Sequence, residues 1–312
     1  MMRTYSVTLL ALALAGCGSN GGASPDATVV REAAADRLVP DAKPLPLTFG
    51  GARPVQLDVP ASYDPTRPTP LLLILHGYGA SGYIQQTYFG FRDLATRERV
   101  LVLAPNGTLD STQRLFWNAT DACCDFEGKQ IDDVGYLTGL ISEVAGSYNV
   151  DPKRIYAMGH SNGGFMAHRL ACDRSQTFAA ILSVAGALPE AAAACQPKEK
   201  VSALQVHGDK DGSVLFEGGS VIGPGTKAYP GAKETVARWA SLSGCGAELT
   251  PSGESFDADA LVAGDETTVA RHACPTGLDA ELWQIVGGAH VPLFTATFSQ
   301  RAWQWLSKHS KP

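Results

Sequence analysis

The segment Gly159–Gly164, "GHSNGG", sets one serine among three glycines, between an apolar run and an amphipathic segment. A serine hydroxyl becomes a strong nucleophile only when a nearby base removes its proton. The G-x-S-x-G pattern is typical of a strained turn from strand to helix, in which the flanking glycines avoid collision with neighbouring elements. Ser161 is therefore the candidate nucleophile. The main-chain N–H of Asn162, at the start of the expected helix, is a candidate donor to an oxyanion.

Candidates for the base and for the acid that orients it occur in two later segments. His290 lies in "IVGGAHVP", directly after the last expected strand, and "VHGDKDGSV" supplies Asp209 and Asp211 after an earlier one. A histidine base needs a carboxylate at its other ring nitrogen, so one of these aspartates should face His290. The chain order serine, aspartate, histidine is that of α/β-hydrolases. These residues alone leave both aspartates open.

A second oxyanion donor and a substrate contact are expected in earlier loops. The segment Leu75–Gly79, "LHGYG", follows an apolar run, where α/β-hydrolases place a loop whose main-chain N–H meets the substrate carbonyl oxygen. The main-chain N–H of Tyr78 is the candidate donor, and a plain glycine turn is the alternative. Trp117 is the candidate substrate contact, although aromatic side chains more often belong to the core.

The elements that must position these residues alternate in type along the chain. Apolar, branched runs predict strands, and amphipathic stretches between several of them predict helices. This alternation predicts a mainly parallel sheet with helices on both faces and an antiparallel edge formed by the first strands. The expected strands are 55–59, 70–76, 100–105, 154–159, 179–186, 203–208 and 282–288, and the expected helices are 134–148, 164–172, 232–244 and 297–308.

Composition excludes several classes of protein. The chain has 312 residues, 45% of them hydrophobic, which suits a globular domain rather than a disordered protein. The formal net charge of -6 offers no basic surface for nucleic acid, so no nucleic-acid partner is expected. Cysteine and histidine spacings match no zinc site, and no metal is expected.

The N-terminal segment predicts export. A short apolar run ends in "LAGC" at Cys17, and residues 1–17 resemble a bacterial lipoprotein signal. The resemblance implies that Cys17 is lipidated and that the protein is anchored at the outer membrane or cell surface. An ordinary cleaved secretory signal, with a secreted product, is the alternative. Residues 18–42 are small and polar and predict a flexible tether, and residues 43–312 predict the catalytic domain.

Six cysteines remain after Cys17, an even number that predicts disulfides in an oxidising compartment. Adjacent Cys123 and Cys124 are not expected to bond each other, because the geometry of neighbouring residues strains such a bridge. Sequence alone leaves 15 connectivities open. The six candidates are Cys123, Cys124, Cys172, Cys195, Cys245 and Cys274.

Several motifs together resemble one branch of the α/β-hydrolases. "PLLLILHGYGAS", "DPKRIYAMGHSNGGFMAHRLAC", "HGDKDGSV" and "GGAH" are similar, in order, to the polyhydroxybutyrate-depolymerase and feruloyl-esterase-like family. The resemblance implies that Asp211, four residues after His207, is the acid. It also implies a Cys245–Cys274 disulfide, with Cys172 and Cys195 as partners for Cys123 and Cys124.

The expected function is that of an exported serine esterase that forms an acyl-enzyme without a cofactor. Ser161 attacks, His290 is the base, and Asp211 orients it. The expected substrate is a poly- or oligo-hydroxyalkanoate ester, and the alternative is a feruloyl or acetylxylan ester of plant polysaccharide. Two other classes stay open, a non-catalytic surface-binding lipoprotein and a serine peptidase. Residues 216–231 predict a loop whose role in access to the site the sequence leaves open.

Overall fold

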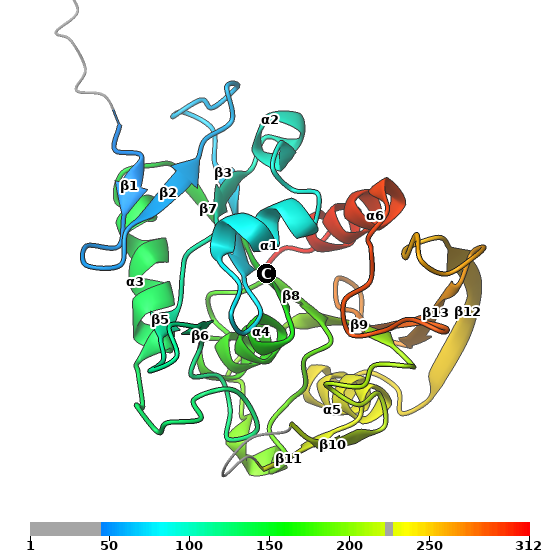
Figure 1. Cartoon of the computed structure of the whole chain (residues 1–312). Coiled ribbons are helices and arrows are strands. Elements are labelled where there is room, and N and C mark those ends of the chain that lie inside the picture. The colour runs from blue at the N-terminus through cyan, green and yellow to red at the C-terminus, as the bar shows by residue number, and fades with distance from the viewer. Residues whose placement is uncertain (1–44, 222–226) are drawn as a thin grey trace, which may run out of the picture. The chain divides into compact units, whose positions relative to one another are not determined.

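The computed structural model describes residues 45–221 and 227–312 (Figure 1). The expectations for the signal segment 1–17, Cys17 and the tether 18–42 lie outside the described residues, as does the middle of the loop 216–231. No described helix is long and apolar enough to cross a membrane.

Ten strands form one sheet, and its central six strands are mutually parallel. The first two strands add an antiparallel edge, as the sequence predicted. A second antiparallel edge, β13 and β12, was not predicted. In spatial order the strands are β1 (Thr48–Phe49), β2 (Val55–Asp58), β4 (Leu101–Leu103), β3 (Thr69–Leu75), β7 (Val150–His160), β8 (Ala180–Val184), β9 (Ser202–Gly208), β14 (Ala280–Ile285), β13 (Thr267–His272) and β12 (Leu249–Phe256).

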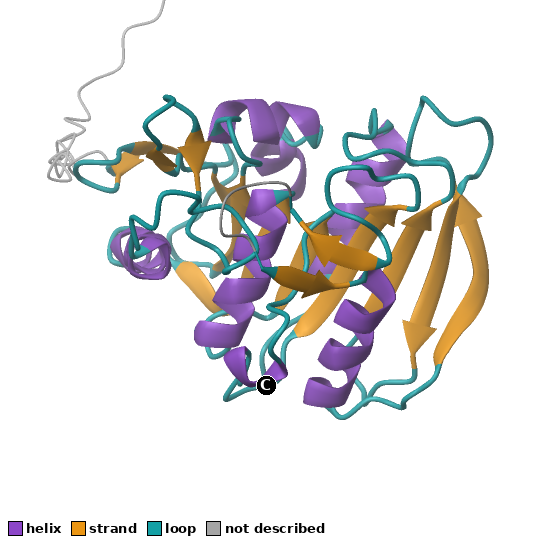
Figure 2. Ribbon diagram, turned by 60° about the horizontal axis from the view of Figure 1, so that its bottom comes forward, coloured by secondary structure: helices purple, strands orange, loops and turns teal. Residues whose placement is uncertain are grey.

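Helices flank the twisted sheet on both sides (Figure 2). The four predicted helices are present, and two short helices follow β3. Two small ribbons lie outside the main sheet. The helices are α1 (Gly82–Tyr88), α2 (Leu94–Glu98), α3 (Asp133–Ala145), α4 (Asn162–Asp173), α5 (Ala232–Ser243) and α6 (Ala296–Ser307), with a 3-10 turn at Ala192–Ala194; the ribbons are β5 (Thr108–Leu109) with β6 (Leu115–Phe116) and β10 (Gly218–Ser220) with β11 (Ala228–Pro230).

Alternation along the strands divides the core into two layers. On β3, Leu71 and Leu73 pack with residues of α3, α4 and α5, whereas Leu72 and Ile74 pack on the opposite face with residues of α2 and α6. Successive side chains of a strand point to opposite faces, so a strand buried on both faces needs a continuous apolar run. This is why "PLLLIL" predicts a central strand, and the predicted α/β-hydrolase architecture of a mostly parallel, doubly covered sheet is confirmed.

The disulfides correct part of the prediction. Cys245 and Cys274 are bonded, as the family resemblance implied. Cys123 and Cys124 are bonded to each other, so the expectation that they pair with Cys172 and Cys195 is wrong, and those two form their own bridge. The expectation assumed a trans peptide, which holds neighbouring Cα atoms about 3.8 Å apart. The Cys123–Cys124 peptide is cis, and the two Cα atoms are 3.0 Å apart.

The sheet order brings the predicted functional segments to one edge. The loop at Tyr78 follows β3, Ser161 follows β7, Asp211 follows β9 and His290 follows β14. The strands β3, β7, β8, β9 and β14 are successive neighbours and run parallel. Their carboxyl ends therefore lie side by side, which is where open α/β sheets place ligand sites.

Candidate active site

Ser161 stands on a tight turn between β7 and α4. Its φ of 54° lies in the left-handed region, a conformation that costs energy for a residue with a side chain. The turn is held by a hydrogen bond from the Ser161 N–H to the Val184 carbonyl (2.8 Å). A side chain at Gly159 would place its Cβ 2.1 Å from the Gly163 oxygen, and one at Gly163 would lie 2.1 Å from the Leu75 oxygen. The two glycines therefore allow β7, α4 and β3 to meet at this point.

The structure brings the three predicted side chains together. His290 Nε2 lies 3.0 Å from Ser161 Oγ, and His290 Nδ1 lies 2.7 Å from Asp211 Oδ2. Asp211 is buried, and its Oδ1 accepts hydrogen bonds from the N–H groups of Ser213 (2.8 Å) and Val214 (2.9 Å). This is the geometry in which a histidine can take a proton from serine while a carboxylate holds its other nitrogen.

Asp209, the other aspartate that the sequence left open, faces elsewhere. Its carboxylate accepts a hydrogen bond from the Gly287 N–H (2.8 Å) and another from Gln284 Nε2 (3.3 Å). Asp209 therefore ties the loop after β9 to the end of β14. The structure places Asp211, and not Asp209, against His290.

The charge of Asp211 is stabilised by its donors. Burial raises the pKa of the Asp211 carboxyl, but hydrogen bonds from His207 and His290 outweigh that effect and hold the pKa below its usual range. A group with so low a pKa stays ionised at neutral pH. The carboxylate can therefore hold the Nδ1–H of His290 and stabilise the imidazolium that forms when His290 accepts a proton.

His160, within the turn, has a contact that the sequence did not predict. Its Nε2 lies 2.7 Å from the main-chain oxygen of His290, and the two rings lie 4.9 Å apart. Burial lowers the pKa of His160 to about 4, so the ring is neutral at pH 7 and its Nε2–H donates to that oxygen. His160 therefore fixes the main chain of His290, a role with no spacing signal in "GHSNGG".

The main-chain N–H groups of the two predicted oxyanion donors have no acceptor among the described residues. In the loop after β3, the Gly77 N–H donates to Gln85 Oε1 (3.1 Å) and the Gly79 N–H donates to the Leu115 oxygen (2.8 Å). Within residues 45–221 and 227–312, nothing accepts from the N–H of Tyr78 or of Asn162, the two predicted oxyanion donors. The loop is thus pinned on either side of Tyr78.

His76 also fixes the loop that carries Tyr78. Its Nδ1–H donates to the Gly77 oxygen (2.8 Å), and its Nε2 accepts from the Gly107 N–H (2.8 Å). Burial lowers the pKa of His76 to about 4, so the neutral ring can serve as donor and acceptor at once.

Trp117 lies beneath the site rather than on its surface. Its side chain is fully buried, and its indole N–H donates to the His76 oxygen (3.1 Å). The Asn162 side chain binds both main-chain groups of Trp117, with its Oδ1 2.7 Å from the N–H and its Nδ2 2.9 Å from the oxygen. This placement argues against the predicted substrate contact and makes Trp117 a support for the two oxyanion loops.

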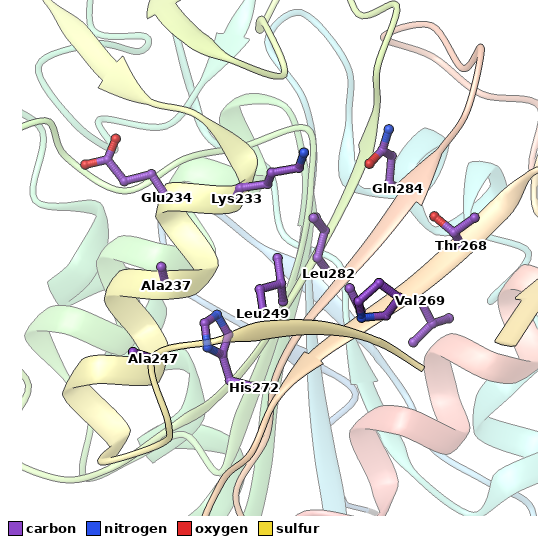
Figure 3. Close-up of a pocket in the computed structure, with 12 residues that line it drawn as sticks. Lys233, Glu234, Ala237, Ala247, Leu249, Thr268, Val269, His272, Leu282 and Gln284 are labelled. Carbon is purple, nitrogen blue, oxygen red and sulfur yellow. The ribbon is translucent and has the colours of Figure 1, made fainter. Parts of the chain in front are cut away.

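A hollow of about 530 Å³ elsewhere on the sheet contains none of these residues. It lies between α5 and the strands β12, β13 and β14, with Lys233 and Glu234 on the helix and Leu282 on the sheet (Figure 3). Across the described part of the chain, no group of three or more His, Cys, Asp or Glu side chains could hold a metal ion.

Comparisons with known proteins agree with this geometry. A family model described as "Putative esterase" matches residues 48–240. The curated protein "Putative esterase NocK" of Nocardia uniformis subsp. tsuyamanensis is 29% identical over 227 residues, which cover 71% of this chain and 64% of that protein. Feruloyl esterase B of Piromyces equi is 25% identical over 265 residues, 83% of this chain and 46% of that protein. The chain thus spans less than two thirds of the length of either relative.

A solved structure shows the same fold. The acetyl xylan esterase from Aspergillus awamori superposes with a TM-score of 0.58 over 82% of this chain and 94% of that chain, at 12% identity. At so low an identity the likeness establishes the fold alone, which is that of the α/β-hydrolases.

The close packing at the turn predicts the effect of one added methyl group. Gly163→Ala should reduce ester hydrolysis at least about 100-fold, because the new carbon would force α4 away from Leu75 and displace Ser161. Gly139→Ala is the matched control, because it also adds a methyl group to a helix but meets nothing within 4 Å. The steady-state rate of ester hydrolysis per folded molecule is measured for both variants. Equal activity of the two variants would contradict the packing argument.

Three buried histidines predict acid sensitivity of the fold. Burial lowers the pKa of His76, His160 and His168 from 6.5 to about 4. The unfolded chain therefore binds protons between pH 6.5 and 4 that the folded chain does not, and the free energy of unfolding falls as pH falls through this window. The loss is on the order of 3 kcal/mol for each histidine. Urea unfolding at pH 8, 7, 5.5 and 4.5 tests this. A midpoint constant below pH 6.5 would contradict it.

Proposed function

This chain belongs to the esterase family whose model matches it, and from that premise we propose that it hydrolyses carboxylic esters through an acyl-enzyme on Ser161. The proposal is carried by one observation, the unbroken contact of Ser161 Oγ with His290 Nε2 and of His290 Nδ1 with Asp211. A non-catalytic surface-binding lipoprotein would have no need to keep these three side chains in register.

The proposed reaction follows the positions of these atoms. Ser161 Oγ bonds to the ester carbonyl carbon while its proton passes to His290 Nε2, and the N–H groups of Tyr78 and Asn162 hold the oxyanion. His290 then gives the proton to the leaving alcohol as the bond from carbon to the alkoxy oxygen breaks. Water attacks the acyl-enzyme with His290 as base, which releases the acid and restores Ser161. The step needs no cofactor.

For the substrate, we propose an acyl group esterified to a polysaccharide, such as a feruloyl or acetyl group. The name of the Piromyces equi relative supports the feruloyl case. A hydroxyalkanoate oligomer or polymer is the second candidate, because apolar side chains close in sequence to the site residues are exposed: Ile84 lies on α1, after the Tyr78 loop, and Val291 and Leu293 follow His290. Exposed apolar side chains of this kind suit a substrate with little hydroxyl content.

We also propose that the protein is exported and that Cys17 carries a lipid anchor at the outer membrane. Three disulfides support export, because such bridges persist in oxidising compartments.

In a bacterial host, Cys17→Ala should move the esterase from the membrane fraction to the soluble periplasmic fraction or stop its maturation. Wild-type protein found wholly in the soluble fraction would contradict the anchor and leave simple secretion.

The nucleophile assignment predicts a large loss of turnover in Ser161→Ala. Hydrolysis of p-nitrophenyl acetate should fall on the order of 10⁴-fold, while the unfolding temperature stays close to that of wild type. Ser241→Ala is the matched control, because Ser241 is exposed on α5 away from the site. Substantial activity in the Ser161 variant would reject the assignment.

A substrate panel separates the proposed substrate classes. Methyl ferulate, acetylated xylan, hydroxybutyrate oligomers and a short peptide are each given to wild type and to the Ser161 variant. The polysaccharide proposal expects the highest kcat/KM on methyl ferulate or acetylated xylan. Preference for hydroxybutyrate oligomers would favour the second candidate, and cleavage of peptides over esters would favour a peptidase.

A further inference from the structure

A series of buried side-chain hydrogen bonds leads from Trp239 on α5 to His207 on β9, and the Nε2 of His207 lies beside the carboxylate of Asp211. Trp239 Nε1 on α5 lies 3.0 Å from His168 Nδ1 on α4, and His168 Nε2 lies 3.1 Å from Gln205 Oε1 on β9. Gln205 Nε2 lies 3.1 Å from His207 Nδ1, and His207 Nε2 lies 3.3 Å from Asp211 Oδ2. This series of hydrogen bonds therefore joins the elements α5, α4 and β9 before it reaches the proposed triad.

At Trp239, where this series of hydrogen bonds begins, only one arrangement of hydrogen atoms is possible. An indole nitrogen can only donate, so His168 Nδ1 must accept from Trp239 and the proton of the neutral ring lies on Nε2. Burial lowers the pKa of His168 to about 4, which keeps the ring neutral at pH 7. His168 Nε2–H then donates to Gln205 Oε1.

The Gln205 side chain accepts from His168 and donates to His207, so the donor-to-acceptor direction continues. Its Nε2 also lies 2.8 Å from the Gly186 carbonyl oxygen, which can only accept, so the amide nitrogen must stand on that side. The second hydrogen of this nitrogen points to His207 Nδ1, which must therefore carry a lone pair. The orientation required by Gly186 agrees with the orientation required by His168.

His207 then directs its only proton toward the Val214 oxygen, with the carboxylate of Asp211 beside it. With Nδ1 as acceptor, the neutral ring carries hydrogen on Nε2, which faces the Val214 oxygen at 2.8 Å and Asp211 Oδ2 at 3.3 Å. Both are acceptors. In the other tautomer, a lone pair on Nε2 would face two oxygen atoms, and Asp211 would lose a donor at the oxygen that holds His290.

Burial makes the donor-to-acceptor direction of these hydrogen bonds costly to reverse. All four residues before Asp211, which are Trp239, His168, Gln205 and His207, are at most 1% exposed. A buried polar group that loses its hydrogen-bond partner is left with the full cost of its desolvation. Reversal of one ring or of the Gln205 amide would leave two acceptors or two donors facing each other.

We propose that His207 is a positioning residue for Asp211, and that Trp239, His168 and Gln205 fix the tautomer in which His207 donates to it. The proposal rests on the proposed function, since it assigns these residues to the orientation of the Ser161–His290–Asp211 triad. They act through Asp211 and touch no substrate.

A change in the pH dependence can be assigned to His207 only if no other titratable group near Asp211 accounts for it. The titratable groups around the Asp211–His290 pair are His207 on β9, His160 on β7 and Tyr229 on β11. Tyr229 is neutral at pH 7, because burial raises the pKa of its hydroxyl. His160 is neutral as well. Of these neighbours, His207 is the one within hydrogen-bonding reach of the Asp211 carboxylate opposite His290.

The first test replaces His207 by an apolar ring of similar size. In His207→Phe we expect kcat to fall at least about 10-fold with KM changed less than about threefold, because an oriented acid matters most in the transition state. With one donor fewer, the carboxylate attracts the imidazolium more strongly. The acidic limb of the kcat/KM profile should therefore move up by about 0.5 pH unit or more.

Two tryptophan variants separate orientation from packing. Trp239→Phe removes the donor at the far end of the chain, and Trp303→Phe removes a similarly buried indole whose N–H binds Glu98 on the opposite face of the sheet. Both should lower the unfolding temperature. Only Trp239→Phe should lower kcat per active site, measured after titration of Ser161 with a fluorophosphonate. Equal kcat in the two variants would overturn the proposed coupling.

Tautomers in the wild-type protein provide a measurement that does not depend on whether a variant folds. Nitrogen-15 spectra of histidine side chains at pH 7.5 should show His168 and His207 protonated at Nε2. His207 protonated at Nδ1 would overturn the proposal, as would a His207→Phe variant with kcat within twofold of wild type and an unmoved acidic limb. Neither result depends on the Ser161→Ala test, so a failure here leaves the proposed function standing.

Discussion

Contact between main chains at Gly159 and Gly163 determines where the proposed nucleophile stands. The strand β7, the helix α4 and the strand β3 meet there with no space for a side chain, and Ser161 leaves the sheet in a left-handed conformation as a result. Every other part of the site is placed relative to this turn. His290 reaches it from β14, and the Tyr78 loop reaches it from β3.

Neutral, buried histidines hold these parts together. His76 fixes the loop that carries Tyr78, and His160 fixes the main chain of His290. A neutral imidazole has one donor and one acceptor, so it can join two main-chain groups without bringing a charge into the core. The charge in the site is thereby concentrated on Asp211, whose hydrogen-bond donors keep it ionised.

The parts that sequence could predict are those whose signal is local. "GHSNGG", "HGDKDGSV" and the glycine-rich segment before His290 each carry their information within a few residues, and the apolar runs predict the parallel strands. The contacts of His160 and of Trp239 join elements with no fixed spacing, so no motif marks them. Two further differences have physical causes: β12 is exposed along most of its length and lacks an apolar pattern, and a buried Trp117 resembles a substrate contact until its neighbours are known.

The strand order has a consequence for how the protein reaches its native state. The two links of the triad join residues that are 129 and 79 positions apart, across parallel strands that pair only after long loops have closed. Such topologies have high contact order and form slowly. Helices such as α3 can form from nearby residues, whereas the proposed nucleophile meets its proposed base only when β7, β9 and β14 have aligned. The proposed activity is therefore a property of the completed sheet, and a partly assembled chain with most of its helices would lack the triad.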